Sequence, residues 1–99
     1  MMSQILVKYY NKFMCKKHFV YILLTENNTL YCGYSDDVEK RFIAHLSGKG
    51  AKYTRANKPV KIVYKKEFST KSEALQEEYR IKKLPRKQKL KLISLNSVA

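Results

Sequence analysis

The sequence predicts one α+β domain, in which a small three-stranded antiparallel sheet is packed by helices in the order β-β-α-β-α-α. Two β-rich segments separated by a turn indicate a hairpin, and a third β-rich segment lies between two helical patterns. The chain has 99 residues, 44% of them hydrophobic, which is enough for a single core and is not typical of disorder. We expect the domain to span residues 18–95, after an N-terminal extension over residues 1–17 in which a short amphipathic helix is one interpretation.

The predicted hairpin pairs residues 18–24 with residues 29–34. Both segments are rich in β-branched and aromatic residues, and the asparagine-containing turn between them tolerates a positive φ. Side chains alternate along a strand, so Tyr21 faces the same side as Leu23. Tyr31 and Gly33 likewise share one face of the second strand.

A first helix is predicted to begin at a capping box opened by Asp36. Val38, Phe42 and Leu46 recur every four residues and form its expected buried stripe. Gly48 follows the last of them and is a suitable residue to end the helix.

The segment over residues 49–59 is expected to be a flexible basic loop. A third strand is predicted over residues 60–68, with Val60, Ile62 and Tyr64 on one side of it.

A second capping box at Thr70 predicts a helix through Leu84, and Pro85 is suited to start a last basic helix. Two adjacent glutamates lie on the first of these helices. The spacing places Glu78 within its apolar stripe, next to Leu75 and Ile81, and gives Glu77 a solvated setting.

The net charge of +13 is concentrated in segments 1–18, 49–66 and 79–99, which contain no acidic residue. Such segregation favours counterion release on a polyphosphate, and therefore nucleic-acid binding. The alternatives are lysines that only increase solubility, or attraction to an anionic membrane surface.

The two cysteines, Cys15 and Cys32, have no metal-ligand spacing that would predict a zinc site. A disulfide between them is one interpretation, and a free thiol in a buried strand is the one we favour. No apolar run approaches the roughly 20 residues of a membrane-spanning helix, and no secretory leader pattern is present. We expect a reducing, cytoplasmic setting and no membrane partner.

Several residues can carry chemistry, each with a structural alternative. Arg41 and His45 share one helix face and could serve a phosphate, or could form a solvated face. Glu78 is a metal ligand or the partner of Arg41 in a buried salt bridge. Tyr21 and Tyr31 could equally be core aromatics. Gly33, at the end of the second strand, has no side chain and would allow a phosphate or another backbone segment to approach closely.

Together these residues resemble the signature of the GIY-YIG nucleases. Residues 19–21 and 31–33, nine residues apart, match its two tripeptides, and Arg41, His45 and Glu78 follow at the family's positions. Segments 49–55, 59–60 and 72–84 resemble the small stand-alone bacterial branch, close to the catalytic domain of the Slx1 structure-specific endonucleases. The chain departs from the signature at Phe19, which replaces its first glycine, and at Cys32, which replaces a branched aliphatic residue.

The resemblance implies a metal-dependent endonuclease that hydrolyses phosphodiesters, with DNA as the expected substrate. Glu78 would hold one Mg²⁺ or Mn²⁺ ion, and Arg41 would clamp the phosphate. Tyr21 or His45 would be the general base, because the ordinary pKa of a tyrosine, about 10, is high for that role. Tyr31 would complete the hydrogen-bond relay.

Substrate-positioning groups are expected in the second strand, on the basic loop and in the C-terminal basic region. These residues are Gly33 in the strand, Lys52, Tyr53 and Arg55 on the loop, and Lys82 and Lys83 in the C-terminal region. Tyr53 could stack on an unpaired base or only cap its loop. Two rival functions remain, a non-catalytic nucleic-acid-binding module and a basic structural protein. A protein partner or a homodimer is left open.

Overall fold

The computed structural model describes residues 17–96. Three strands and four helices follow one another along this part of the chain, in the predicted order with one short helix added. The elements are β1 (His18–Thr25), β2 (Leu30–Ser35), α2 (Val38–Leu46), α3 (Lys52–Ala56), β3 (Pro59–Phe68), α4 (Lys71–Lys82) and α5 (Arg86–Leu95).

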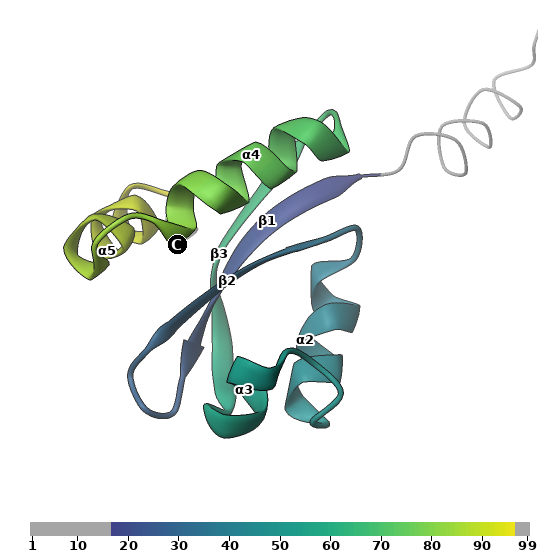
Figure 1. Ribbon diagram of the computed structural model, residues 1–99, viewed down its shortest axis with the longest axis vertical. Helices are drawn as coiled ribbons and strands as arrows, with labels where there is room; N and C mark the ends of the chain where they lie inside the picture. Colours follow the sequence, from purple (N-terminus) through teal and green to yellow (C-terminus); the bar gives the residue numbers. More distant parts are fainter. Residues whose placement is uncertain (1–16, 97–99) are drawn as a thin grey trace, which may run out of the picture.

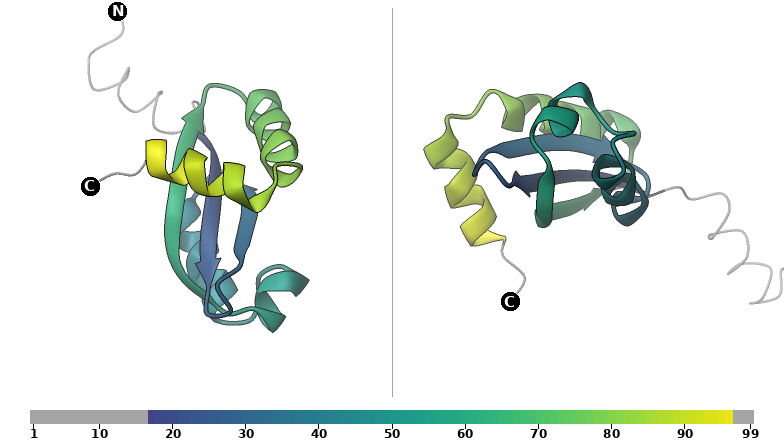
Figure 2. Two further views of the ribbon diagram at one scale, coloured as in Figure 1. Left: turned by 90° about the vertical axis from the view of Figure 1, so that its left-hand side faces the viewer. Right: turned by 90° about the horizontal axis from the view of Figure 1, so that it is seen from below.

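The strands form one antiparallel sheet in the order β2-β1-β3, with helices on both sides. In Figure 1, α4 and α5 lie on one side of the sheet and α2 and α3 on the other. Figure 2 shows the same arrangement from two further directions. The α+β prediction is therefore confirmed, and β2 and β3 are the two edge strands.

Each face of the sheet has its own hydrophobic cluster. Val20 and Ile22 of β1 and Cys32 of β2 pack beneath α4, against Ala74 and Ile81. On the opposite face, beneath α2, the cluster is formed by Tyr21, Leu23 and Val38. Because alternate residues of β1 serve opposite clusters, its buried run is continuous, as expected for a central strand covered on both faces.

The alternation predicted within each strand of the hairpin is observed, and the structure adds the register between the strands. Tyr21 lies opposite Gly33, and Leu23 lies opposite Tyr31. The turn places Asn28 at a φ of 58°, a conformation that asparagine tolerates better than most residues.

Helix α2 differs from the prediction at its start and in its buried stripe. Its N-cap is Asp37, whose carboxylate accepts a hydrogen bond from the Lys40 backbone amide at 3.1 Å, one residue later than the predicted cap at Asp36. Val38 is buried as predicted, but Leu46 is exposed and His45 is buried in its place. Phe42 is partly buried and packs against the same cluster, so the side of α2 that faces the sheet follows the i, i+4, i+7 positions of Val38, Phe42 and His45.

The prediction of a flexible loop over residues 49–59 is wrong. A short helix, α3, occupies its middle, and Thr54 is buried within it. The backbone amides of Thr54 and Arg55 both donate hydrogen bonds to the Ala51 carbonyl. A five-residue helix with one buried side chain has too little periodicity to be seen in the sequence.

The prediction that Val60, Ile62 and Tyr64 share one side of the third strand is also wrong. The pairing of β1 with β3 shifts between Ile22, which lies opposite Tyr64, and Leu23, which lies opposite Ile62. The extra residue in β3 turns Tyr64 towards the α4 cluster while Ile62 packs in the α2 cluster. Val60 is exposed.

Helix α4 has the predicted N-cap, since the Thr70 hydroxyl accepts from the Glu73 backbone amide at 3.1 Å. It ends at Lys82, two residues before the predicted end. Leu75, predicted in its buried stripe, is 40% exposed. Glu77, predicted to be solvated, has a side chain only 15% exposed, slightly less than the 19% of Glu78.

The predicted amphipathic helix and Cys15 lie outside the described residues, as does all of the N-terminal extension except Lys17. Cys32 is a buried free thiol. Within residues 17–96, no helix has the length and apolar character needed to cross a membrane.

Candidate functional site

A buried hydrogen bond between Tyr21 and His45 lies at the centre of the candidate site. The Tyr21 hydroxyl is 2.9 Å from His45 Nε2, and both side chains are 1% exposed. The two residues come from β1 and α2, which the fold brings together on the same side of the sheet. The Tyr31 ring lies edge-on to the imidazole, with ring centroids 5.2 Å apart.

Thr54 of α3 holds the other side of the imidazole. Its Oγ1 is 2.7 Å from His45 Nδ1 and 2.9 Å from the Ala51 carbonyl oxygen. A carbonyl only accepts, so the Thr54 hydroxyl donates its single proton to Ala51. The Thr54 oxygen is then left as an acceptor facing His45 Nδ1.

Two glycines make room for these side chains. A Cβ on Gly33 would lie 2.5 Å from the Tyr21 hydroxyl oxygen, so only glycine lets the phenol extend across β2 at this position. A Cβ on Gly50 would lie within van der Waals contact of the His45 ring, at a distance that no real side chain adopts. Gly33 was predicted to allow the close approach of a phosphate, but the Tyr21 phenol occupies the space beside it. Gly50 was not predicted as a site residue.

Burial sets the protonation states of the pair. Desolvation, with a smaller contribution from Tyr31, raises the pKa of Tyr21 to about 12, and the neighbouring Arg41 guanidinium opposes this rise. Desolvation and then Arg41 lower the pKa of His45 below its ordinary value of 6.5. At neutral pH the site therefore holds a protonated phenol and a neutral imidazole, which can accept the phenol's proton.

Tyr53 extends the aromatic cluster towards solvent. Its ring stacks on Tyr31 at 6.0 Å with an interplanar angle of 20°, and it is 41% exposed. A pocket of about 240 Å³ opens beside this stack at the free edge of β2. The pocket is lined by Leu30, Tyr31, Cys32, Tyr53, Lys82 and Lys89. It therefore joins the α2 side of the sheet to the two helices on the opposite side.

Glu78 does not join the Tyr21–His45 group. It lies on α4, which packs on the opposite face, and its carboxylate is near Cys32. Burial raises the pKa of the Cys32 thiol to about 12, and the Glu78 carboxylate adds to that rise. Lys82 is the ion-pair partner of Glu78, at 3.7 Å, so the predicted alternative of a buried salt bridge to Arg41 is not found among the described residues.

The two adjacent glutamates differ in how firmly they are held. Glu77 makes two contacts with the Arg80 guanidinium, one of them at 3.0 Å, and this hydrogen bonding lowers the pKa of its carboxyl. Among the described residues, Glu78 has only the long contact to Lys82, at 3.7 Å, outside ordinary hydrogen-bond distance. Its oxygens are thus the freer of the two to bind another cation.

No group of three or more histidine, cysteine, aspartate or glutamate side chains within residues 17–96 could enclose a metal ion. A single carboxylate is nevertheless compatible with Mg²⁺ or Mn²⁺, which often bind through one or two carboxylates together with water and substrate phosphates. The half-buried, weakly paired Glu78 suits such a partial site.

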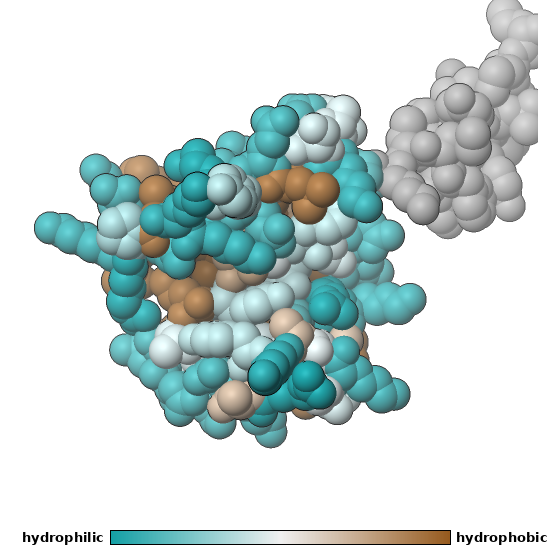
Figure 3. Space-filling view, in the orientation of Figure 1, coloured by the Kyte–Doolittle hydropathy of each residue, from teal (hydrophilic) through white to brown (hydrophobic). Residues whose placement is uncertain are grey.

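The remaining predicted substrate-positioning residues are exposed cations at different places. Lys52 and Arg55 flank Tyr53 on α3, and Lys82 lines the pocket. The Lys83 ammonium lies 4.1 Å from the centre of the Tyr79 ring. Lys83 is not part of the lining of the pocket at the β2 edge. Hydrophilic residues cover most of the α4 and α5 surface in Figure 3, with hydrophobic residues in separate patches.

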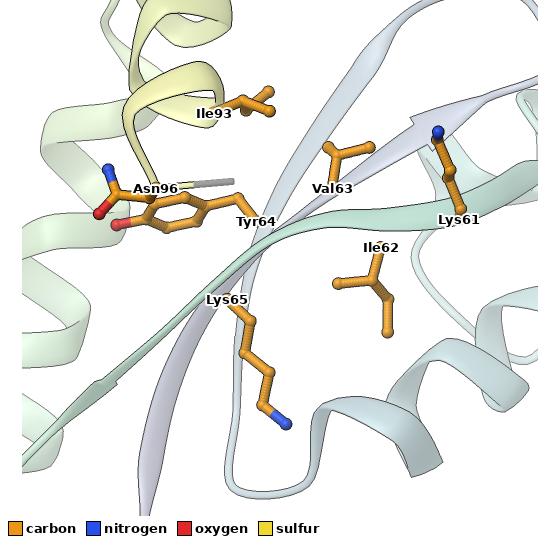
Figure 4. Close-up of a pocket in the computed structure, with 7 residues that line it drawn as sticks. All are labelled: Lys61, Ile62, Val63, Tyr64, Lys65, Ile93 and Asn96. Atoms are coloured by element: carbon orange, nitrogen blue, oxygen red, sulfur yellow. The ribbon is translucent and has the colours of Figure 1, made fainter. Parts of the chain in front are cut away.

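A larger hollow of about 400 Å³ lies along the other edge of the sheet, between β3 and α5. Figure 4 shows its lining, which includes Lys61, Ile93 and Asn96. None of the predicted site residues contributes to it, so the chemistry is better supported at the β2 edge.

Comparisons with known proteins identify the family of the domain and similar structures. Residues 17–91 match the family model described as the GIY-YIG catalytic domain. A UPF0213 protein of Staphylococcus saprophyticus is 54% identical over 79% of this chain and 95% of its own length, and one of Oceanobacillus iheyensis is 55% identical over 81% and 93%. The solution structure of a UPF0213 protein from Bacillus halodurans is 44% identical with a TM-score of 0.55, and covers 82% of this chain and 86% of that one.

Proposed function

Because the chain belongs to the GIY-YIG catalytic-domain family, we propose that it is an endonuclease that hydrolyses phosphodiester bonds in DNA with the help of one Mg²⁺ or Mn²⁺ ion. The observation that carries the proposal is the buried contact of 2.9 Å between Tyr21 and His45. A protonated phenol bonded to a neutral imidazole is an arrangement that can take a proton from water and pass one on.

In this mechanism Tyr21 and His45 act together as the general base. The Tyr21 hydroxyl oxygen accepts a proton from the attacking water while its own proton moves to His45 Nε2. The raised pKa of Tyr21 makes a free phenolate unfavourable, so Tyr21 alone is a poor base. Passing its own proton to the imidazole lets the hydroxyl oxygen accept a proton from water without first becoming a phenolate. Tyr21 and His45 are thus not alternatives in this mechanism: Tyr21 contacts the water, and His45 receives the proton.

Arg41 is proposed to hold the scissile phosphate. Its half-buried guanidinium lies beside Tyr21 and has no carboxylate partner within residues 17–96. A planar guanidinium donates two parallel hydrogen bonds to phosphate oxygens, and its charge stabilises the negative charge that develops there. Glu78 would hold the divalent ion, which would supply Lewis-acid activation of the phosphate and the leaving oxygen.

The pocket at the β2 edge supports a preference for unpaired nucleotides. Tyr53 is exposed and already stacked on Tyr31, so a base could continue that stack, while Lys82 and Lys89 are placed for phosphates. These contacts do not recognise base edges in a groove, which is how proteins distinguish sequences. We therefore propose that cleavage is not sequence-specific and is directed by single-stranded or branched structure.

The test is cleavage of labelled single-stranded, duplex and branched DNA with Mg²⁺, Mn²⁺ or EDTA, comparing wild type with Glu78→Gln. The matched control is Glu77→Gln, one residue away on α4 and bound to Arg80 instead. We expect metal-dependent cutting that is lost in Glu78→Gln, retained in Glu77→Gln, and accompanied by nearly unchanged DNA binding in both.

Salt-sensitive binding without cleavage of any substrate would contradict the catalytic proposal and favour a non-catalytic nucleic-acid-binding module. Equal loss of cleavage in both variants would contradict the metal-ligand role of Glu78, because a ligand role is specific to one carboxylate.

A further inference from the structure

We propose that Thr54 is a positioning residue that fixes the tautomer of His45, keeping the imidazole proton on Nδ1 so that Nε2 can receive the proton of Tyr21. The inference rests on the proposed function for its catalytic consequence. The tautomer itself follows from the contacts of three buried side chains and can be measured without any cleavage.

The contacts of Thr54 assign the donor and the acceptor in its hydrogen bond with His45. The Thr54 hydroxyl has one proton, and the Ala51 carbonyl at 2.9 Å can only accept it. The remaining contact of Oγ1, 2.7 Å from His45 Nδ1, then requires a proton on the nitrogen. Thr54 is 2% exposed, so solvent does not compete for these positions.

The tyrosine side is compatible with the same answer but does not fix it. The phenol of Tyr21 is protonated at neutral pH and can donate to His45 Nε2, at 2.9 Å, when the imidazole proton is on Nδ1. A phenol oxygen can also accept from a protonated Nε2. The Thr54 contact therefore decides between the two tautomers.

Two features of the backbone hold Thr54 in place. The amide of Thr54 bonds to the Ala51 carbonyl at 3.1 Å, so the residue that accepts its side-chain proton also anchors its backbone. Gly50 allows the segment before α3 to pass directly over the His45 ring, where a Cβ would collide. The segment 50–54 thus forms a support for the imidazole.

The same helix also touches the aromatic cluster. Tyr53, the residue before Thr54, stacks on Tyr31 at 6.0 Å. Groups that position the imidazole and groups that face the pocket are therefore consecutive in sequence on one short helix. Replacing the Thr54 hydroxyl alone separates these two roles, because the Tyr53 ring is left unchanged.

The experiment uses the full chain in three forms: wild type, Thr54→Val, which has nearly the same shape without the hydroxyl, and Thr54→Ser, which keeps the hydroxyl. Long-range ¹H–¹⁵N spectra of the imidazoles distinguish a protonated Nδ1 from a protonated Nε2. His18 is removed by His18→Gln in a parallel set, so that the His45 signals are assigned.

We expect neutral His45 with a protonated Nδ1 in wild type and in Thr54→Ser, and a shift towards protonated Nε2 in Thr54→Val. Cleavage by Thr54→Val should fall by about 10- to 100-fold in kcat with little change in KM, by analogy with the loss of a hydrogen-bond partner that orients a metal-bound histidine. Thr54→Ser should restore most of the rate.

A wild-type spectrum with the proton on Nε2 would overturn the inference, even if the protein cleaves DNA efficiently. So would a Thr54→Val protein that keeps the Nδ1 tautomer. If the tautomer depends on Thr54 as expected but no form cleaves DNA, the inference stands and the proposed function fails. The two are therefore tested separately.

Discussion

Gly33→Ala tests whether the position of the Tyr21 hydroxyl determines activity. The added Cβ would lie 2.5 Å from the hydroxyl oxygen and 2.6 Å from the ring carbon that bears it. The tyrosine must retreat by about 0.9 Å, the difference between that approach and an ordinary contact of 3.4 Å. Tyr21 is 1% exposed, so there is no free space into which it can move.

The expected cost has two parts. Overpacking a filled core costs about 1–3 kcal/mol of the free energy of unfolding. A displacement of this size is also enough to break the hydrogen bond of 2.9 Å to His45. Misplacing a reacting group by about 1 Å can cost on the order of 100-fold in rate, and we expect a loss of that order in kcat.

Gly48→Ala is the matched control. Gly48 has a φ of 79°, which strains an alanine, but no heavy atom lies within 4 Å of its added Cβ. The strain costs about 1–2 kcal/mol of stability, similar to the expected effect of Gly33→Ala, at a position away from Tyr21. We expect this variant to keep its kcat.

Urea unfolding gives the stability of both variants, and steady-state cleavage of a single-stranded oligonucleotide gives kcat. The reasoning is refuted if Gly33→Ala cleaves at the wild-type rate. It is refuted equally if the two variants lose activity in proportion to their loss of stability, because then the position of the Tyr21 hydroxyl has no separate effect.

Two further predictions concern pH and base stacking. The pKa of His45 is lowered on folding, so below its ordinary value of 6.5 the unfolded chain binds more protons than the folded one, and stability falls as the pH drops towards the folded pKa. The free energy of unfolding should fall by up to about 1.4 kcal/mol per pH unit and become constant below the folded pKa. Urea unfolding between about pH 5 and 7.5 should show this fall in wild type and not in His45→Gln. The same pH dependence in the variant would contradict the prediction. Tyr53→Leu should weaken binding of a single-stranded oligonucleotide by about 1–3 kcal/mol in fluorescence anisotropy, whereas Tyr53→Phe should bind like wild type. Equal weakening by both would show that the hydroxyl and not the ring is used.

The hairpin and the alternation within each of its strands could be predicted because both depend on local sequence. The two aromatic runs have a period of two, whereas the register that places Tyr21 opposite Gly33 comes from the structure. The irregularity in β3 could not be predicted in this way. Ile62 and Tyr64 are both typical strand residues, so the sequence gives no sign of the extra residue between them. That residue changes only the face of the sheet to which one of them points relative to the other.

The candidate site was predicted in part for the same reason. Arg41 and His45 are one helical turn apart, and this spacing placed them on one face. Thr54 and Gly50 were missed because their importance lies in contacts with His45 made through the tertiary fold. The available signal was the sequence Gly50-Ala51-Lys52-Tyr53-Thr54 itself, a small residue followed by a hydroxyl within a basic segment, and without a structure it fits a loop equally well.

The strand order bears on the separation of Glu78, on α4, from Tyr21 and Tyr31, on the opposite face of the sheet. As an edge strand, β2 directs Tyr31 to one face and Cys32 to the other, with its free edge open to solvent. A nucleic-acid strand following that edge would meet Tyr53 on one side and Lys82 on the other, as the lining of the pocket suggests. A phosphate held there would stand between the α2 face and α4, so that Arg41 and a metal ion on Glu78 could approach it from opposite sides. On the proposed mechanism, a site divided in this way would assemble fully only around its substrate. Within residues 17–96 the partner of the Glu78 carboxylate is Lys82, at 3.7 Å, and this long contact would leave Glu78 able to bind a metal ion when substrate is present.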